Sequence, residues 1–217
     1  HWIFDGTGLG YGDVLGADDG VVGYETLGCP LTFDDLQLPV ARPYPGLPAD
    51  IARGAELHRA IDAFAERHPA FQTSRARVSD VRRRFGGVMI DMFYDHFLAA
   101  NWGDYHPDEA LPVFAARQYA LLLDHLHRMP EASRKVIVRM SETDWLSSYA
   151  EAETIEYALD RIAARLSRPG AFVGSGAELR RAYEEFKSDS ACFLADARQF
   201  AKHFVPTLAP GGSVQTR

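Results

Sequence analysis

The stretch Val88-Met89-Ile90-Asp91-Met92-Phe93-Tyr94-Asp95-His96-Phe97-Leu98 carries the strongest folding signal in this chain. Its apolar residues recur at the three- and four-residue spacing of a helix that buries one face, and the pattern extends on both sides. We therefore predict a long helix over residues 76–101. The buried stripe predicted for this helix consists of Val78, Val81, Phe85, Val88, Met89, Met92, Phe93, Phe97 and Leu98.

The chain from Pro48 onward repeats this helical spacing between prolines and glycines that end each segment. One further helix is expected to open at Pro48. Others are expected over residues 108–128, 131–149, 152–167, 176–187 and 189–205. The predicted fold class is therefore all-α, a bundle of about six to seven helices.

Charge and glycine content divide the 217-residue chain into unequal parts. Residues 1–50 contain one basic residue, eight acidic residues and nine of the 18 glycines, whereas residues 51–217 contain 22 basic and 22 acidic residues. We predict an acidic, Gly- and Pro-rich segment with irregular structure or short strands over residues 1–46. The helical domain is predicted over residues 47–205, and a flexible tail over residues 206–217.

Composition also bears on the cellular setting. No apolar run reaches the roughly 18–20 residues that span a bilayer, so no membrane partner is expected. The two cysteines, Cys29 and Cys192, are far apart and suit a reducing compartment better than a disulfide scaffold. No signal peptide is visible after His1, so we expect a cytoplasmic protein.

Three polar residues, Asp91, Asp95 and His96, interrupt the apolar helix. The two aspartates are one turn apart and leave the same face. A carboxylate inside an apolar run is costly to desolvate unless it is paired or binds a cation. Adjacent His and Asp in such a helix are also typical of HD-type metal phosphohydrolases. The alternative is that both aspartates lie on an exposed stripe and that His96 is a half-buried, hydrogen-bonded residue.

A second polar pair, His58 and Asp62, also has the spacing of one helical turn, beside the apolar Leu57 and Ile61. A His and a carboxylate in this arrangement can bind a divalent metal together. The alternative is a capping or surface pair. Combining the two clusters predicts a metal site whose ligands are His58, Asp62, Asp95 and His96.

The ligand types indicate which metal and which chemistry this site would use. Imidazoles and carboxylates without cysteine favour Mn²⁺, Mg²⁺ or Fe²⁺ over structural zinc. Such a metal lowers the pKa of a bound water and polarises a phosphoryl oxygen. A carboxylate that is not fully committed to the metal can accept the proton of that water. We therefore predict catalytic roles for Asp91 and Asp95.

Arginines crowd the start of the predicted 76–101 helix. The cluster, called here the arginine patch, consists of Arg75, Arg77, Arg82, Arg83 and Arg84. It could bind an acidic protein or a phosphate, and the alternative is a solvated helix face. Arg82 and Arg83 are predicted to bind substrate, together with Arg59, which adjoins His58 and could reach a phosphate. No nucleic acid is expected as a partner, because residues 51–217 are neutral overall and contain no nucleic-acid-binding motif.

Several motifs follow one another in the order found in one enzyme family. They are His58-Arg59-Ala60-Ile61-Asp62, Asp91-Met92-Phe93-Tyr94-Asp95-His96-Phe97-Leu98 followed by Trp102, Trp145-Leu146 with Tyr149, Ile155 with Ala158-Leu159, and Arg168-Pro169. Together they resemble the acyl carrier protein phosphodiesterase family over residues 47–205. The resemblance implies an HD-like helical fold and hydrolysis of the phosphodiester that joins 4′-phosphopantetheine to the serine of holo acyl carrier protein. It also implies divalent-cation dependence, typically on Mn²⁺, and an acidic carrier protein as partner.

The N-terminal part departs from that family. Members usually carry a Gly-Asn-Leu-x-x-Asp-Phe motif before the histidine helix, and its Asp is functionally important. Here Asp35 is at a similar distance before His58 and is the candidate to replace it. Residues 1–42 instead resemble a fragment of the N,N-dimethylformamidase large subunit family, and no activity is inferred from that fragment.

Two other functions remain compatible with the sequence. The first is an HD-like phosphohydrolase that acts on a small phosphoester, for which the arginine patch would be irrelevant. The second is a helical relative that has lost the N-terminal metal residues and is not an enzyme. The metal content of the purified protein would distinguish the second from both enzymes.

Overall fold

The computed structural model describes residues 57–58, 60–128, 131–164, 166 and 170–207. Helices and the turns between them account for this part of the chain, which contains no strand, so the all-α prediction is confirmed. A helical stretch over residues 60–65 precedes α3. The α-helices are α3 (Pro69–Arg77), α4 (Gly86–Ala100), α5 (Trp102–Tyr105), α6 (Leu111–Asp124), α7 (Glu131–Thr143), α8 (Trp145–Ser148), α9 (Ala152–Ala163), α10 (Ala177–Arg181) and α11 (Tyr183–Thr207). The 3-10 turns are η1 (Arg83–Phe85), η2 (Leu126–Arg128) and η3 (Gly170–Phe172).

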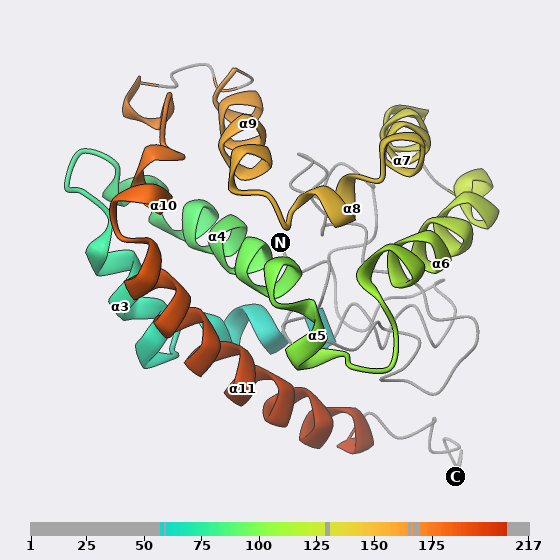
Figure 1. Cartoon of the computed structure of the whole chain (residues 1–217), viewed down its shortest axis with the longest axis horizontal. Coiled ribbons are helices and arrows are strands. Elements are labelled where there is room, and N and C mark those ends of the chain that lie inside the picture. The colour runs from blue at the N-terminus through green and yellow to red at the C-terminus, as the bar shows by residue number, and fades with distance from the viewer. Residues whose placement is uncertain (1–56, 59, 129–130, 165, 167–169, 208–217) are drawn as a thin grey trace, which may run out of the picture.

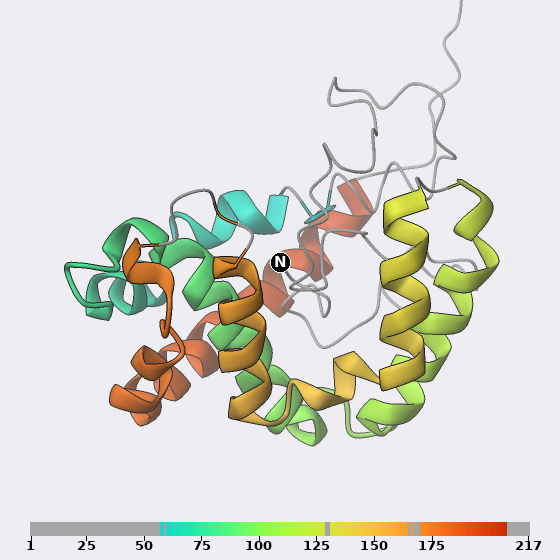
Figure 2. The ribbon, with the colours of Figure 1, turned by 90° about the horizontal axis from the view of Figure 1, so that it is seen from above.

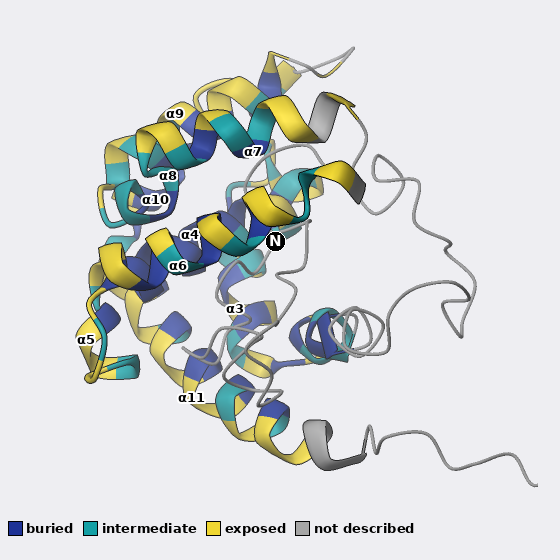
Figure 3. Cartoon of the chain, turned by 90° about the vertical axis from the view of Figure 1, so that its right-hand side faces the viewer, coloured by how far each residue is buried: buried dark blue, intermediate teal, exposed yellow. Residues whose placement is uncertain are grey.

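The central helix of the bundle is α4, which α3, α9 and α11 surround (Figure 1). Eleven of its 15 residues are buried, more than one face of a helix can supply, so α4 is covered on several sides. The long helix α11 packs along both α3 and α4. It carries buried residues on the side that faces them and exposed residues on the other side (Figure 3).

Aromatic rings hold α3, α4 and α11 together. Phe193 of α11 lies 6.0 Å from the ring of Phe71 in α3 and 5.5 Å from that of Tyr94 in α4. The Tyr94 hydroxyl is also hydrogen-bonded to Ser74 at 2.9 Å, so its polar end is satisfied inside the core. This packing fixes α4, and with it the polar residues of the candidate site.

A second group of helices, α6 and α7, is connected to the first through α8. Helix α6 contacts both α7 and α8, and the Tyr119 hydroxyl of α6 accepts a hydrogen bond from the Leu146 amide of α8 at 2.6 Å. Figure 2 shows α7 and α9 standing opposite each other, with α8 joining them at one end. Within the described residues, no helix has both the length and the apolarity needed to cross a membrane.

The predicted helix over residues 76–101 is wrong in its first ten residues. Helix α3 ends at Arg77, and α4 begins only at Gly86. The intervening loop is held to other elements, because the Ser79 amide and hydroxyl donate to Glu178, and Arg82 donates to the Ala171 carbonyl at 2.9 Å. Tertiary hydrogen bonds therefore override the helical spacing here. Val81, predicted to be buried, is 69% exposed as a result.

Three further helix boundaries also differ from the predictions. The helix predicted over residues 131–149 is divided at Asp144, whose left-handed backbone (φ 43°) separates α7 from α8. The helix predicted over residues 152–167 ends at Ala163. The break expected near residue 188 lies instead at Ala182, and α11 continues without interruption from Tyr183. The predicted segment 1–46 and most of the tail lie outside the described residues.

Gly176 tests the close approach of α9 to the start of α10, and Gly87 in α4 serves as the comparison. A Cβ on Gly176 would lie 2.7 Å from the Glu156 Cα. This atom belongs to the backbone, so moving it away would cost substantial free energy. We expect Gly176→Ala to destabilise the protein by about 1–3 kcal/mol through overpacking. Gly87 in α4 has no neighbour within 4 Å of such a Cβ, so Gly87→Ala should stabilise the protein by about 0.5–1 kcal/mol through helix propensity. Urea denaturation of both variants measures this, and equal effects would contradict the close packing at Gly176.

Candidate active site

The predicted pair His58 and Asp62 is formed. The His58 Nε2 lies 3.3 Å from the Asp62 Oδ2, and the His58 side chain is only 1% exposed whereas that of Asp62 is 41% exposed. Leu57 and Ile61 beside them are fully buried, as expected for an edge next to the core. The pair therefore reaches from the core to the surface, unlike a solvated surface pair.

The two aspartates of α4 have different environments. Asp95 is buried, with 1% of its side chain exposed, whereas Asp91 one turn earlier is partly exposed. The alternative in which both lie on an exposed stripe is therefore wrong for Asp95. A carboxylate at this depth is costly to desolvate and is the strongest sign of function in α4.

His96 is also buried, but both of its ring nitrogens are used by other groups. Nδ1 donates to the Tyr149 carbonyl at 2.9 Å, which leaves Nε2 to accept from the Tyr183 hydroxyl at 2.8 Å. Burial lowers the pKa of this imidazole, although the Tyr149 carbonyl acts in the opposite direction. This geometry does not favour the predicted role as a metal ligand. It suits a neutral histidine that joins α4 to the α8–α9 turn and to α11.

The metal site predicted from four side chains is not assembled within the described residues. No three His, Cys, Asp or Glu side chains of that part of the chain converge on one point. The described residues supply a His58–Asp62 pair and the buried Asp95, which are ligand types that suit Mn²⁺ or Mg²⁺. Asp35 lies outside the described residues.

The arginine patch is divided between helix and loop. Four of its members are paired with acids: Arg75 with Glu66 at 2.5 Å, Arg77 with Asp189 at 3.2 Å, Arg82 with Glu178 at 3.1 Å and Arg83 with Asp80 at 2.5 Å. Arg84 instead lies over the Phe85 ring at 4.4 Å. The patch thus contains fewer uncompensated charges than the sequence indicates.

Two of the three arginines predicted to bind substrate, Arg82 and Arg83, differ in their contacts and exposure. Arg82 is committed to the fold, because it donates to the Ala171 carbonyl and pairs with Glu178 at 3.1 Å. This geometry does not support a substrate-binding role for Arg82. Arg83 is 58% exposed and remains accessible. Arg59 lies outside the described residues.

Sequence reasoning missed Glu178, a buried acid that organises the loop between α3 and α4. It is 3% exposed and accepts hydrogen bonds from Ser79, Arg82 and Arg181. Burial alone would raise the pKa of this carboxyl, but the hydrogen bonds from Ser79, Arg181 and Arg82 together hold the pKa below its ordinary value. The sequence carries no signal of this role, because two of the three partners, Ser79 and Arg82, are about 100 residues away.

Comparison with known proteins covers the same region. The family model described as acyl carrier protein phosphodiesterase matches residues 39–197. A relative of that name from Serratia proteamaculans (strain 568) is 31% identical over 155 residues, which are 71% of this chain and 80% of the relative. Another of that name, from Photorhabdus laumondii subsp. laumondii, is 30% identical over 138 residues, 64% of this chain and 70% of the relative. The comparison with solved structures found no significant match to the chain.

The lowered pKa of His96 predicts how this residue contributes to stability as the pH changes. The fold favours the neutral imidazole, so the unfolded chain takes up a proton first as the pH falls below the ordinary His value of 6.5. The stabilisation that His96 supplies is therefore full above that pH and is lost progressively below it. Denaturant titrations should show that His96→Gln costs more unfolding free energy at about pH 7.5 than at about pH 5.5. An equal cost at both pH values would contradict the lowered pKa.

Proposed function

Because this chain belongs to the acyl carrier protein phosphodiesterase family, we propose that it hydrolyses the phosphodiester linking 4′-phosphopantetheine to the serine of holo acyl carrier protein. The products are apo acyl carrier protein and 4′-phosphopantetheine. The observation that carries the proposal is the buried carboxylate of Asp95 in α4. The family match spans it together with the His58–Asp62 pair.

The proposed reaction uses a divalent cation, Mn²⁺ in the first instance, with His58, Asp62 and Asp95 as the proposed ligands. Within the described part of the chain these three side chains do not converge on one point, so cation binding would have to draw them together. The two side chains of the pair already face each other, and their donor types suit this ion. A further ligand would come from outside the described residues, and Asp35 is the candidate. When bound, the cation lowers the pKa of a water and polarises a phosphoryl oxygen.

The other residues of the site have supporting roles in this proposal. Asp91 is more accessible than Asp95 and one turn away on the same helix, so it is suited to accept a proton from the attacking water. His96 positions α4 against the α8–α9 turn through its bond to Tyr149. Arg83 and Arg59 are the arginines proposed to meet the substrate phosphate.

The direct test incubates the full chain with holo acyl carrier protein and Mn²⁺ and follows the carrier by mass spectrometry. We expect the carrier to lose the mass of phosphopantetheine. Asp95→Asn and His58→Ala should each reduce the rate by about 100-fold or more, the range typical of groups that act directly in catalysis. His203→Ala on the exposed face of α11 is the matched control and should retain the wild-type rate.

Outcomes of this test separate the three functions that the sequence allowed. An unchanged carrier together with hydrolysis of a small phosphoester such as bis-p-nitrophenyl phosphate would replace the proposal with a small-molecule phosphohydrolase. No hydrolysis of either substrate by folded, metal-supplied protein would indicate a non-enzymatic relative. Circular dichroism of each variant establishes that lost activity is not lost structure.

Cation removal gives a separate prediction. Dialysis against a chelator should abolish hydrolysis of the carrier protein, and Mn²⁺ should restore it. We expect Zn²⁺ to restore less, because the proposed ligands are carboxylate-rich and lack cysteine. Full activity after exhaustive chelation, with no metal detected by elemental analysis, would contradict the cation-dependent reaction.

A further inference from the structure

A cavity of about 600 Å³ lies between α7 and α9, away from the polar residues of α4. We call it the α7–α9 groove. Its lining residues are Lys135, Val136, Arg139 and Thr143 of α7, Trp145 and Ser148 of α8, and Glu153, Thr154, Tyr157 and Arg161 of α9. Nothing in the proposed hydrolysis uses these side chains.

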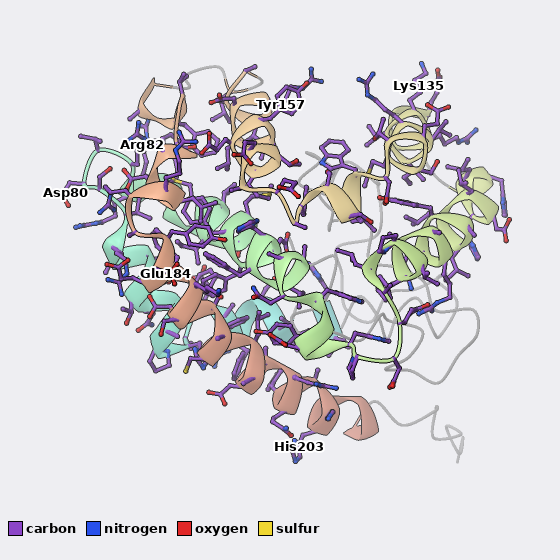
Figure 4. All side chains as sticks on the ribbon, in the orientation of Figure 1. Asp80, Arg82, Lys135, Tyr157, Glu184 and His203 are labelled. Carbon is purple, nitrogen blue, oxygen red and sulfur yellow. The ribbon has the colours of Figure 1, made fainter. Side chains whose placement is uncertain are left out.

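Both walls of the groove have the regular spacing of a helix face. Each helix contributes residues at positions i, i+1, i+4 and i+8, which are Lys135, Val136, Arg139 and Thr143 on α7. The chain passes from α7 through α8 into α9, so the two walls run antiparallel and α8 closes one end (Figure 2). Lys135 and Tyr157 lie on opposite walls (Figure 4).

The charge of the groove is positive, although the chain as a whole is acidic. Three cations, Lys135, Arg139 and Arg161, line it against the single acid Glu153, whereas the formal net charge of the chain is −7. Lys135 pairs with Glu131 at 2.7 Å. Within the described part of the chain, neither Arg139 nor Arg161 lies within ion-pair distance of a carboxylate, in contrast to the paired cations of the arginine patch.

Apolar surface accompanies these cations. Val136, Trp145 and Tyr157 contribute to the lining, and Tyr157 is 61% exposed, an unusual state for a large aromatic side chain. Arg161 lies 6.0 Å from the Tyr157 ring, so the cation and the aromatic face form one surface. Aromatic and arginine side chains of this kind carry most of the binding energy in protein interfaces.

We propose that the α7–α9 groove binds an acidic amphipathic helix of the carrier protein, an inference that rests on the proposed function. Two antiparallel helices with apolar side chains between them form a seat for the apolar face of a third helix. The free guanidinium groups of Arg139 and Arg161 complement carboxylates at the edges of that helix. Charge complementarity therefore selects this occupant over a neutral or basic helix.

The groove is also connected to the candidate active site through one hydrogen bond. Ser148 lines the groove, and the carbonyl of the next residue, Tyr149, accepts the hydrogen bond from His96. His96 adjoins Asp95 in α4. A carrier protein held between α7 and α9 would thus lie next to the α8–α9 turn, to which His96 hydrogen-bonds the helix bearing Asp95.

The test measures binding of apo carrier protein, the product, to the full chain by isothermal titration calorimetry, so that it does not depend on hydrolysis. We expect Arg139→Glu combined with Arg161→Glu to weaken binding by about tenfold to a hundredfold and to reduce its dependence on salt. The matched control is Lys187→Glu combined with Lys202→Glu, two exposed cations on α11 outside the groove, which should bind as the wild type does. Tyr157→Ser should weaken binding without changing the salt dependence.

The outcomes separate this inference from the proposed function. If the carrier protein is hydrolysed and bound but the groove variant behaves like the α11 control, the groove inference fails and the function stands. If the wild type neither binds nor hydrolyses the carrier protein, both fail. If the groove variant instead abolishes self-association of this chain, seen by analytical ultracentrifugation, the groove is a contact between copies and the inference is overturned. Thermal melts of each variant exclude misfolding as the cause.

Discussion

The burial of the Asp95 carboxylate within α4 is the constraint on which the rest of the account depends. A single carboxylate with 1% exposure in a helix made mostly of apolar residues is expensive to place there. The fold surrounds α4 with α3, α9 and α11, and it hydrogen-bonds the neighbouring His96 to Tyr149 and Tyr183. A buried setting of this kind strengthens the electrostatic interactions of any group that binds there, because the local dielectric constant is low.

Helical periodicity was sufficient to predict the class of the fold and the existence of the apolar helix that lies at its centre. The apolar spacing around Asp95 located α4, and the His58–Asp62 pairing followed from the geometry of one helical turn. The same spacing failed at Val81, because the loop before α4 donates its hydrogen bonds to Glu178 and Ala171, far away in sequence. The break at Asp144 was also invisible to periodicity, since it consists of one residue in a left-handed conformation.

The candidate site was predicted less completely than the fold, for a related reason. The sequence shows that Asp95 and His96 are adjacent, but not that both ring nitrogens of His96 are hydrogen-bonded to Tyr149 and Tyr183. It likewise shows a cluster of arginines, but not that Arg82 is bound to Glu178 within the fold. Two cations without an ion pair among the described residues, Arg139 and Arg161, line one groove because α7 and α9 stand opposite each other. Partner assignments of this kind depend on contacts between distant residues, which a single sequence does not contain.

The central claim, that Asp95 is buried in order to bind a divalent cation, has a direct test that does not involve catalysis. The measurement is the thermal unfolding midpoint of the wild type and of Asp95→Asn as a function of Mn²⁺ concentration. A ligand that binds only the folded state raises this midpoint, and the rise grows with the logarithm of the ratio of ligand concentration to Kd. The account predicts that Mn²⁺ stabilises the wild type and has little effect on Asp95→Asn. The same Mn²⁺-dependent rise in both proteins would contradict it.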